Sequence, residues 1–195
     1  SRSSAASDVY KRQGVNNVLL GKSAGDAATT ASGSVFLGYD AGGTVTTGNM
    51  NIAIGNDAMN GATTTGDNNI AIGVSALDAL TSGDDNIAIG TDALGAQATA
   101  NQNLAIGKKA LELHTTGTQN TAIGHHTLDS SASDMVRNTA IGYNTLHQLN
   151  HANADNNTAV GAYSAISLTQ GQGNVFVGDG SGYLGTTVSY AVCIG

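Results

Sequence analysis

Histidine is the residue type whose grouping in this chain most suggests chemistry. All five histidines fall within one stretch of the sequence: His114, His125, His126, His147 and His151. Neutral imidazoles are common ligands of zinc and other transition metals, so a metal site is the first chemistry to consider. No cysteine or repeated carboxylate completes a ligand set, and the neighbours His125 and His126 do not share a face. We therefore predict no metal-binding, cofactor-binding or catalytic residues, and interpret the histidines as surface and loop residues.

Two other short motifs resemble binding sites only superficially. Asp84 and Asp85 stand together, but the spacing of a calcium-binding EF-hand loop is absent. The run Gly178–Gly182 lacks the Lys-Ser/Thr pair that follows a phosphate-binding loop. A glycan-cleaving enzyme needs two carboxyl groups held in a groove, whereas the acidic residues here are scattered over turns. Because no nucleophile, base and orienting group can be assembled, we predict that the protein is not an enzyme.

The composition excludes several classes of function and favours a repeat architecture. Glycine contributes 27 of 195 residues, proline is absent, and charged residues make up only 11% of the chain, whereas a typical globular domain has about 25%. The formal charge is −7. The basic residues beyond position 13 are too few for a nucleic-acid-binding surface: Lys22, Lys108, Lys109 and Arg137. With so few basic residues, we expect no nucleic-acid partner. No apolar run reaches the roughly 18 residues of a membrane-spanning helix, so we also expect no membrane insertion.

The first residues are unlike the rest of the chain. Ser3–Gln13 reads SSAASDVYKRQ, which resembles the in-frame translation of a transposase adapter used to build sequencing libraries. We therefore interpret residues 1–13 as a non-native, disordered leader and the chain as the translation of a metagenomic fragment. Residues 14–195 are expected to be a repeat solenoid truncated at both ends, because the chain stops inside a repeat at Ala191–Gly195.

One five-residue motif organises everything after the leader. The sequence NIAIG occurs at Asn51–Gly55, Asn69–Gly73 and Asn86–Gly90, and related motifs bring the number of copies to eleven. The glycines that end the motifs are Gly21, Gly38, Gly55, Gly73, Gly90, Gly107, Gly124, Gly142, Gly161, Gly178 and Gly195. Successive glycines are 17 to 19 residues apart, most often 17. A period of this length predicts a solenoid in which each repeat forms one coil.

Each column of the aligned repeat has a structural interpretation. Asparagine precedes the glycine by four residues in nine of eleven copies, which predicts a ladder of stacked amides. The residue before the glycine is always aliphatic, and the one before that is usually alanine. Each motif is therefore interpreted as a short strand in register with the next, and the x-x-Ala-Leu segment after it as a short helical turn. The predicted fold is an all-β parallel β-solenoid of about 17 residues per coil.

The outer face of these strands predicts an assembly of several chains. Three successive residues of each strand are mainly apolar, although alternate side chains point to opposite faces. One face lines the interior of the coil, and the other needs a partner because strands of parallel sheets are normally buried on both faces. Thr121, Thr139 and Thr158 make this outer face less apolar in the later coils. Three chains around a common axis would bury it, so we predict a homotrimer.

The repeated pattern N-x-A-I-G-x-x-A resembles two families of surface fibres. With NTAIG at Asn120–Gly124 and Asn138–Gly142 and the Ala-Leu segments that follow, it resembles the repeats of bacteriophage tail fibres. It is also similar to the heads of trimeric autotransporter adhesins, but the 17-residue period is longer than the coil usual there. The resemblance implies a trimeric, left-handed parallel β-roll in an extracellular location, on a virion or a bacterial surface. It further implies a structural and adhesive role in attachment to a host cell, with a cell-surface receptor or glycan as partner; the tail fibre is preferred and the adhesin head is the alternative.

Two single-chain functions are lesser alternatives. An ice-binding solenoid would need a flat threonine array, and a hexapeptide-repeat acyltransferase would need three hexads per coil, of which only Ile72–Leu77 fits one. The longest divergences between repeats are His126–Arg137 and His147–Asn156. Any contact loop is expected in these two segments, although neutral variation in loop length is the favoured interpretation.

Overall fold

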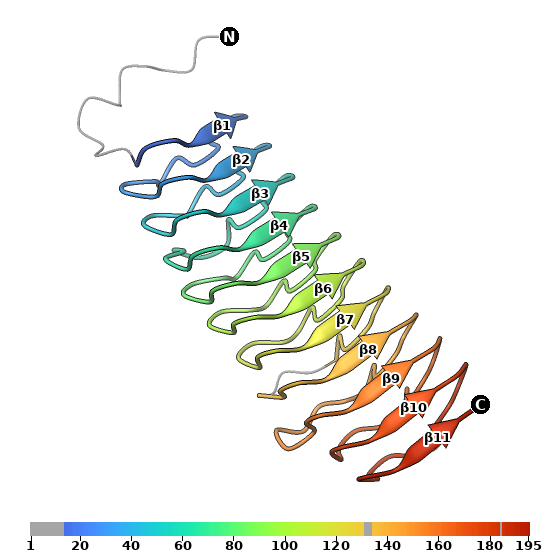
Figure 1. The fold of residues 1–195 in the computed structure, drawn as a ribbon. Coiled ribbons are helices and arrows are strands. Elements are labelled where there is room, and N and C mark those ends of the chain that lie inside the picture. Colours follow the sequence, from blue (N-terminus) through green and yellow to red (C-terminus); the bar gives the residue numbers. More distant parts are fainter. Residues whose placement is uncertain (1–13, 131–133, 184) are drawn as a thin grey trace.

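The computed structural model describes residues 14–130, 134–183 and 185–195. These residues form one sheet of eleven parallel strands that follow one another in chain order (Figure 1). Each strand has three residues: β1 Val18–Leu20, β2 Val35–Leu37, β3 Ile52–Ile54, β4 Ile70–Ile72, β5 Ile87–Ile89, β6 Leu104–Ile106, β7 Thr121–Ile123, β8 Thr139–Ile141, β9 Thr158–Val160, β10 Val175–Val177 and β11 Val192–Ile194. The predicted parallel β-solenoid is therefore confirmed. The predicted leader, residues 1–13, lies outside the described residues.

Each strand stacks on the strand of the next coil without a shift in register. Ile52–Ile54 pairs position by position with Ile70–Ile72. The N–H of Gly55, directly after β3, donates to Leu37 O of the preceding coil at 2.9 Å. Gly55 has a φ of 135°, and a Cβ there would lie 2.5 Å from Gly73 O, so both conformation and space require glycine. With about 4.8 Å per step, the strands β1 to β11 span roughly 48 Å.

The predicted helical turn after each strand is wrong, because no residue that the structure describes is helical. The same residues therefore include no helix that could cross a membrane. The segment instead alternates between ordinary and left-handed backbone. The second and fourth residues after the glycine have positive φ in successive coils: Asp57 and Met59, Ser75 and Leu77, Asp92 and Leu94, Lys109 and Leu111, His126 and Leu128, Asn144 and Leu146, and Tyr163 and Ala165.

This alternation points the backbone of the turn at the neighbouring coils. The N–H of Asp57 donates to Tyr39 O of the preceding coil at 3.0 Å, and the N–H of Met59 donates to Ala76 O of the following coil at 3.0 Å. In a helix, these groups would bond four residues back within their own segment. Segments such as SALDAL do favour a helix by propensity. Stacking overrides that preference because each coil satisfies its backbone through the coils above and below.

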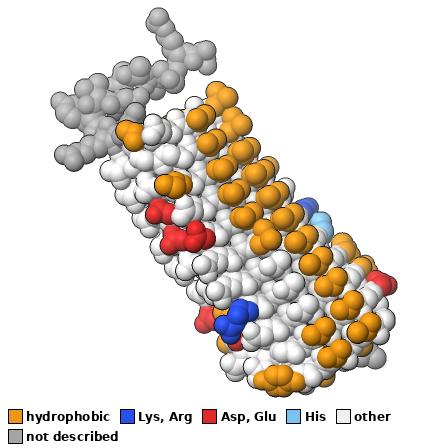
Figure 2. Space-filling model, viewed as in Figure 1, with side chains coloured by type: hydrophobic (Ala, Val, Ile, Leu, Met, Phe, Trp, Pro, Cys, Tyr) orange, Lys and Arg blue, Asp and Glu red, His pale blue; other side chains and the backbone are white. Residues whose placement is uncertain are grey.

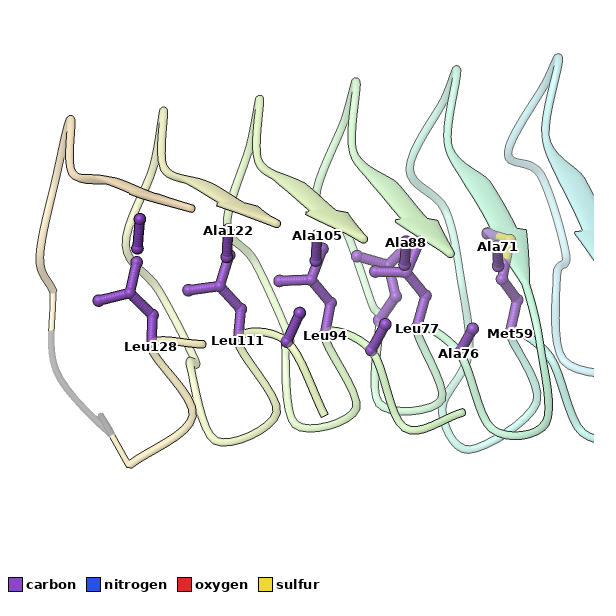
Figure 3. Close-up of a cluster of buried hydrophobic side chains, with 14 of the residues drawn as sticks. Met59, Ala71, Ala76, Leu77, Ala88, Leu94, Ala105, Leu111, Ala122 and Leu128 are labelled. Atoms are coloured by element: carbon purple, nitrogen blue, oxygen red, sulfur yellow. The ribbon is translucent and has the colours of Figure 1, made fainter. Parts of the chain in front are cut away.

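Each coil encloses a thin core built from one small and one large side chain. In the middle coils the central strand residue is a fully buried alanine, and the turn supplies a buried leucine or methionine. Figure 3 shows Leu94 below Ala105 and Leu111 below Ala122. The small alanine lets the turn approach the sheet closely, and burying each leucine side chain stabilises its layer by about 1.5–3 kcal/mol.

In two coils near the ends of the sheet, the strand supplies the large core side chain and the turn supplies the small residue. Phe36 in β2 and Phe176 in β10 replace the strand alanine, and both are buried. Glycine then replaces the turn leucine. A Cβ on Gly42 would lie 2.6 Å from the Phe36 ring, and a Cβ on Gly182 would lie 2.4 Å from the Phe176 ring. The interior of each layer is therefore filled to a similar density whichever side contributes the large residue.

The predicted asparagine ladder is confirmed, and its amides are buried inside the coil. Asn86 Nδ2 donates to Ala100 O at 2.8 Å and to Asn69 Oδ1 at 3.0 Å. Its Oδ1 accepts the backbone N–H of Asn103 at 3.0 Å. Each amide thus ties the end of the loop to the strand and one coil to the next, which satisfies polar groups that would otherwise be buried without partners.

The outer sheet face, formed by the first and third residues of each strand, carries two files of aliphatic side chains. Nineteen of these 22 positions are valine, isoleucine or leucine. The other three are the threonines Thr121, Thr139 and Thr158. Figure 2 shows the hydrophobic side chains as rows that run along the molecule over the strands. None of the 22 positions is charged.

Candidate functional site

The two longest divergent segments lie on successive coils, where their side chains meet. His126–Arg137 belongs to the coil between β7 and β8, and His147–Asn156 to the coil between β8 and β9 (Figure 1). Residues 131–133 of the first segment lie outside the described residues. The two segments contact each other through the carboxylate of Asp129, which is only 5% exposed.

Asp129 lies between two imidazoles. Its Oδ2 contacts Nδ1 of His126 in the same turn, and its Oδ1 contacts Nδ1 of His147 on the following coil. Both histidine side chains are about one-third exposed. A buried carboxylate is strongly unfavourable unless it is paired and hydrogen-bonded. His126 Nδ1 is the hydrogen-bonding partner of this carboxylate and His147 Nδ1 lies in contact with it; the three residues are named here the His–Asp–His cluster.

Aromatic rings form a file beside the His–Asp–His cluster. The ring of His125 stacks on that of Tyr143 with centroids 5.7 Å apart, and Tyr143 meets Tyr163 edge to face at 5.3 Å. His125 also meets His126 edge to face at 4.3 Å. Both tyrosines are at least 40% exposed. Rings repeated on successive coils therefore offer solvent an amphipathic platform of the kind that is enriched at interaction surfaces.

His125 and Asp78, both on the loop side, have shifted pKa values. Loss of hydration, followed by the neighbouring His126, lowers the pKa of His125. On earlier coils, burial raises the pKa of Asp78, and the like charges of Asp57 and Asp92 raise it further. These acids are closer to one another than the sequence suggested, but they come from turns of different coils. An acidic cluster alone does not make a catalytic site.

His114 is a core residue, so the prediction that all histidines are surface and loop residues is wrong. It stands seven residues after the motif glycine, a position that Leu80 and Leu149 occupy in other coils, and it is fully buried. Burial lowers its pKa to about 4. Its Nε2 lies 3.2 Å from Nδ2 of Asn120, so the ring joins the core to the asparagine ladder.

The histidines therefore do not converge on a single metal site. His125, His126 and His147 lie together, whereas His114 is in the core and His151 lines a separate groove. Within residues 14–130, 134–183 and 185–195, no group of three His, Cys, Asp or Glu side chains is placed to hold a metal ion.

The aspartates of the loop ends form backbone hydrogen bonds, which agrees with their interpretation as turn residues. Asp67 Oδ1 accepts the N–H of Asn49 at 2.6 Å, and Asp84 Oδ1 accepts the N–H of Asp67 at 2.8 Å. Asn101 Oδ1 continues the series by accepting the N–H of Asp84 at 2.6 Å. These side chains make a second polar ladder, which fastens the end of each loop to the next coil.

Comparison with known proteins leaves the chain without an assigned family: no family model, curated protein or solved structure matches it. A function for the chain therefore has to rest on the outer sheet face and on the side chains that the loops bring together.

The sequence identified the two divergent segments but missed the contact between them. Asp129 and His147 each stand five residues after a motif glycine, so in-register stacking places one next to the other. His125 and Tyr143 likewise share the first position after the glycine. Polar or aromatic residues at the same repeat position on successive coils are the signal in the sequence that predicts both contacts.

Proposed function

We propose that this chain is a stiff segment of an extracellular attachment fibre. Three parallel copies form the fibre, which holds or displays a surface that contacts the host cell. The observation that carries the proposal is the outer sheet face, which has 22 uncharged positions along eleven strands. The resemblance to phage tail-fibre repeats supports the same role, with the adhesin head as the alternative.

The outer sheet face has the composition of a protein interior. Parallel sheets are normally covered on both faces, and this coil covers only the inner one. The face is roughly 48 Å long and about 10 Å wide, which makes about 480 Å² before side-chain relief is added. A contiguous apolar surface of several hundred Å² marks an interaction site. Even with neighbours above and below, Ile141 and Val177 remain 37% exposed.

Further copies of this chain are the partners that match the face along its whole length. The side chains repeat at the strand interval of about 4.8 Å, and an identical ladder has the same repeat. Around a threefold axis, the first-position file of one chain would meet the third-position file of the next. The two files of each chain, six in the trimer, would then all be enclosed between the chains. Every layer of this interface would be aliphatic except at the level of Thr121, Thr139 and Thr158.

The mass of the full chain in solution, measured by light scattering, tests the proposal. We expect three times the chain mass of 19.4 kDa. Replacing Ile72 and Ile89 together by lysine should yield a folded monomer, because charges in the interface would be desolvated. Val74→Lys is the matched control, since Val74 follows β4 closely and is 47% exposed but lies outside the outer sheet face. A monomeric wild-type chain, or a trimer that survives the double substitution, would overturn the proposal.

A further inference from the structure

A polar groove crosses the loops of three successive coils, between β8 and β11. It has a volume of about 270 Å³. Six side chains line it: His151, Asn153, Gln170, Gln172, Thr187 and Ser189. Every one of them can form hydrogen bonds, and the lining includes no lysine, arginine, aspartate or glutamate. The groove is therefore suited to a neutral ligand that is rich in hydrogen-bonding groups.

The groove follows from a difference in coil length. The coil that ends at Gly161 has 19 residues, whereas the next two have 17. Its longer loop contains His151 and Asn153, which line one part of the groove. The shorter loops that follow contribute Gln170, Gln172 and their neighbours. The groove therefore lies where this longer loop, which belongs to the divergent segment His147–Asn156, meets the two shorter ones.

Three amide side chains in the groove are available to a ligand. Those of Asn153, Gln170 and Gln172 form no hydrogen bond with any residue in the described part of the chain. Each amide can donate two hydrogen bonds and accept through its carbonyl oxygen. A pair of neighbouring hydroxyl groups can use both functions of one amide, because one hydroxyl accepts while the other donates.

An aromatic residue stands next in the chain to Ser189, which lines the groove. Tyr190 follows Ser189 in the chain and is 75% exposed. Its ring packs across Gly173, where a Cβ would lie 2.8 Å from the ring, and Gly173 follows Gln172. The ring is therefore held against the backbone beside the lining residues. The negative face of an aromatic ring attracts weakly positive C–H groups, such as those on one face of a pyranose ring.

We propose that this groove binds a neutral pyranose residue of a cell-surface glycan. The combination of amides and hydroxyl groups without charged side chains, with an exposed tyrosine ring packed across the residue after Gln172, matches a ligand that has hydroxyls at its rim and C–H groups on its faces. The volume lies just below the roughly 300 Å³ at which sites for drug-sized ligands begin, which suits a single sugar ring. This inference rests on the proposed attachment function. Each site is shallow, and three copies on one fibre would increase its avidity for a surface.

An array of immobilised glycans, probed with the full chain, tests the groove. We expect binding to glycans that end in one or a few neutral sugars, and competition by the corresponding free methyl glycoside. Asn153→Ala combined with Gln172→Ala should weaken binding about a hundredfold, at about tenfold for each lost amide contact. Gln148→Ala is the control, because Gln148 is an exposed amide on the same long loop that does not line the groove.

Three outcomes would overturn the glycan site: binding to no neutral glycan, binding confined to sialylated or sulfated glycans, or equal binding by the double variant. Loss of competition by the free glycoside would also contradict recognition of a single sugar ring. The solution mass of the same samples separates this inference from the proposed function. A trimer that binds no glycan would contradict the glycan site but not the proposed fibre. A monomer would contradict the proposed fibre.

Discussion

The strand side and the loop side of each coil follow different rules. From the ladder position to the motif glycine, every coil uses five residues, whereas the remainder ranges from 12 to 14 residues. The strands keep their register through all ten steps. The extra residues of the longer coils are all taken up on the loop side. The strand side therefore determines the rise per coil and the register of the strands. The loop side can vary in length and shape without changing either.

The difference between the sides lies in how their polar groups are satisfied. On the strand side, a buried asparagine bonds both neighbouring coils, so its substitution leaves several buried groups without partners. On the loop side, the equivalent ladder of aspartate and asparagine is partly exposed, and water can replace a lost partner. Substitutions that unpair buried groups on the strand side are therefore expected to cost more stability than substitutions of partly exposed groups on the loop side.

Replacing Asn86 by alanine should cause the largest loss of stability. The change removes the acceptor for the Asn103 N–H and for Gln97 Nε2, and the donor to Ala100 O. At about 1–3 kcal/mol for each of these three buried groups, we expect a loss of roughly 3–9 kcal/mol in the free energy of unfolding in urea. Asn101→Ala removes the loop-side asparagine of the following coil and should cost about 1 kcal/mol. Equal losses would show that the two sides do not differ.

The exchange of large residues between strand and turn can be tested with a double substitution. Phe36→Ala alone should destabilise the chain by about 3–5 kcal/mol because it leaves a cavity. Adding Gly42→Leu should recover about half of that loss, since Met59 and Leu77 occupy the same turn position with left-handed φ. Gly42→Leu alone should be destabilising because its Cβ would lie 2.6 Å from the ring. A double variant less stable than Phe36→Ala alone would contradict the exchange; urea unfolding measures all three.

Acid should destabilise the protein through His114. Its pKa is lowered to about 4 in the folded state, so the unfolded chain binds the proton more tightly. The contribution of the neutral ring is fully present above the unfolded pKa of about 6.5 and is lost as the pH falls toward 4, amounting to about 3 kcal/mol. His114→Leu, which has the residue type found at this position in other coils, should show a weaker pH dependence in that window. Unfolding curves at several pH values that are parallel for the two proteins would contradict the prediction.

The smallest effect is expected at a partly exposed ion pair of the loop side. Lys109 Nζ lies 3.1 Å from Glu112 Oε1, and the two side chains are 31% and 24% exposed. Exposed pairs contribute little because water and salt screen them. Glu112→Gln should therefore leave the urea midpoint unchanged within the error of measurement. A shift as large as that of Asn101→Ala would show that the loop side depends on its surface charges.

The sequence predicted the strand side well because each of its requirements leaves a mark in a column. The asparagine, the central alanine and the motif glycine are each visible as a repeated residue type. The turn was misassigned because SALDAL has helical propensity by itself, and its real conformation is decided by hydrogen bonds to other coils. His114 was missed because one polar residue interrupts a column of buried aliphatic residues. The groove could not be foreseen, because it depends on the relative lengths of three loops.

Contacts between strands in the described residues run only between consecutive coils. In-frame duplication of a 17-residue unit would therefore lengthen the rod by about 4.8 Å without disturbing any other layer. In the proposed fibre, the number of repeats would therefore determine the distance between base and tip. The length of that fibre would change by simple recombination, while its loops evolve separately.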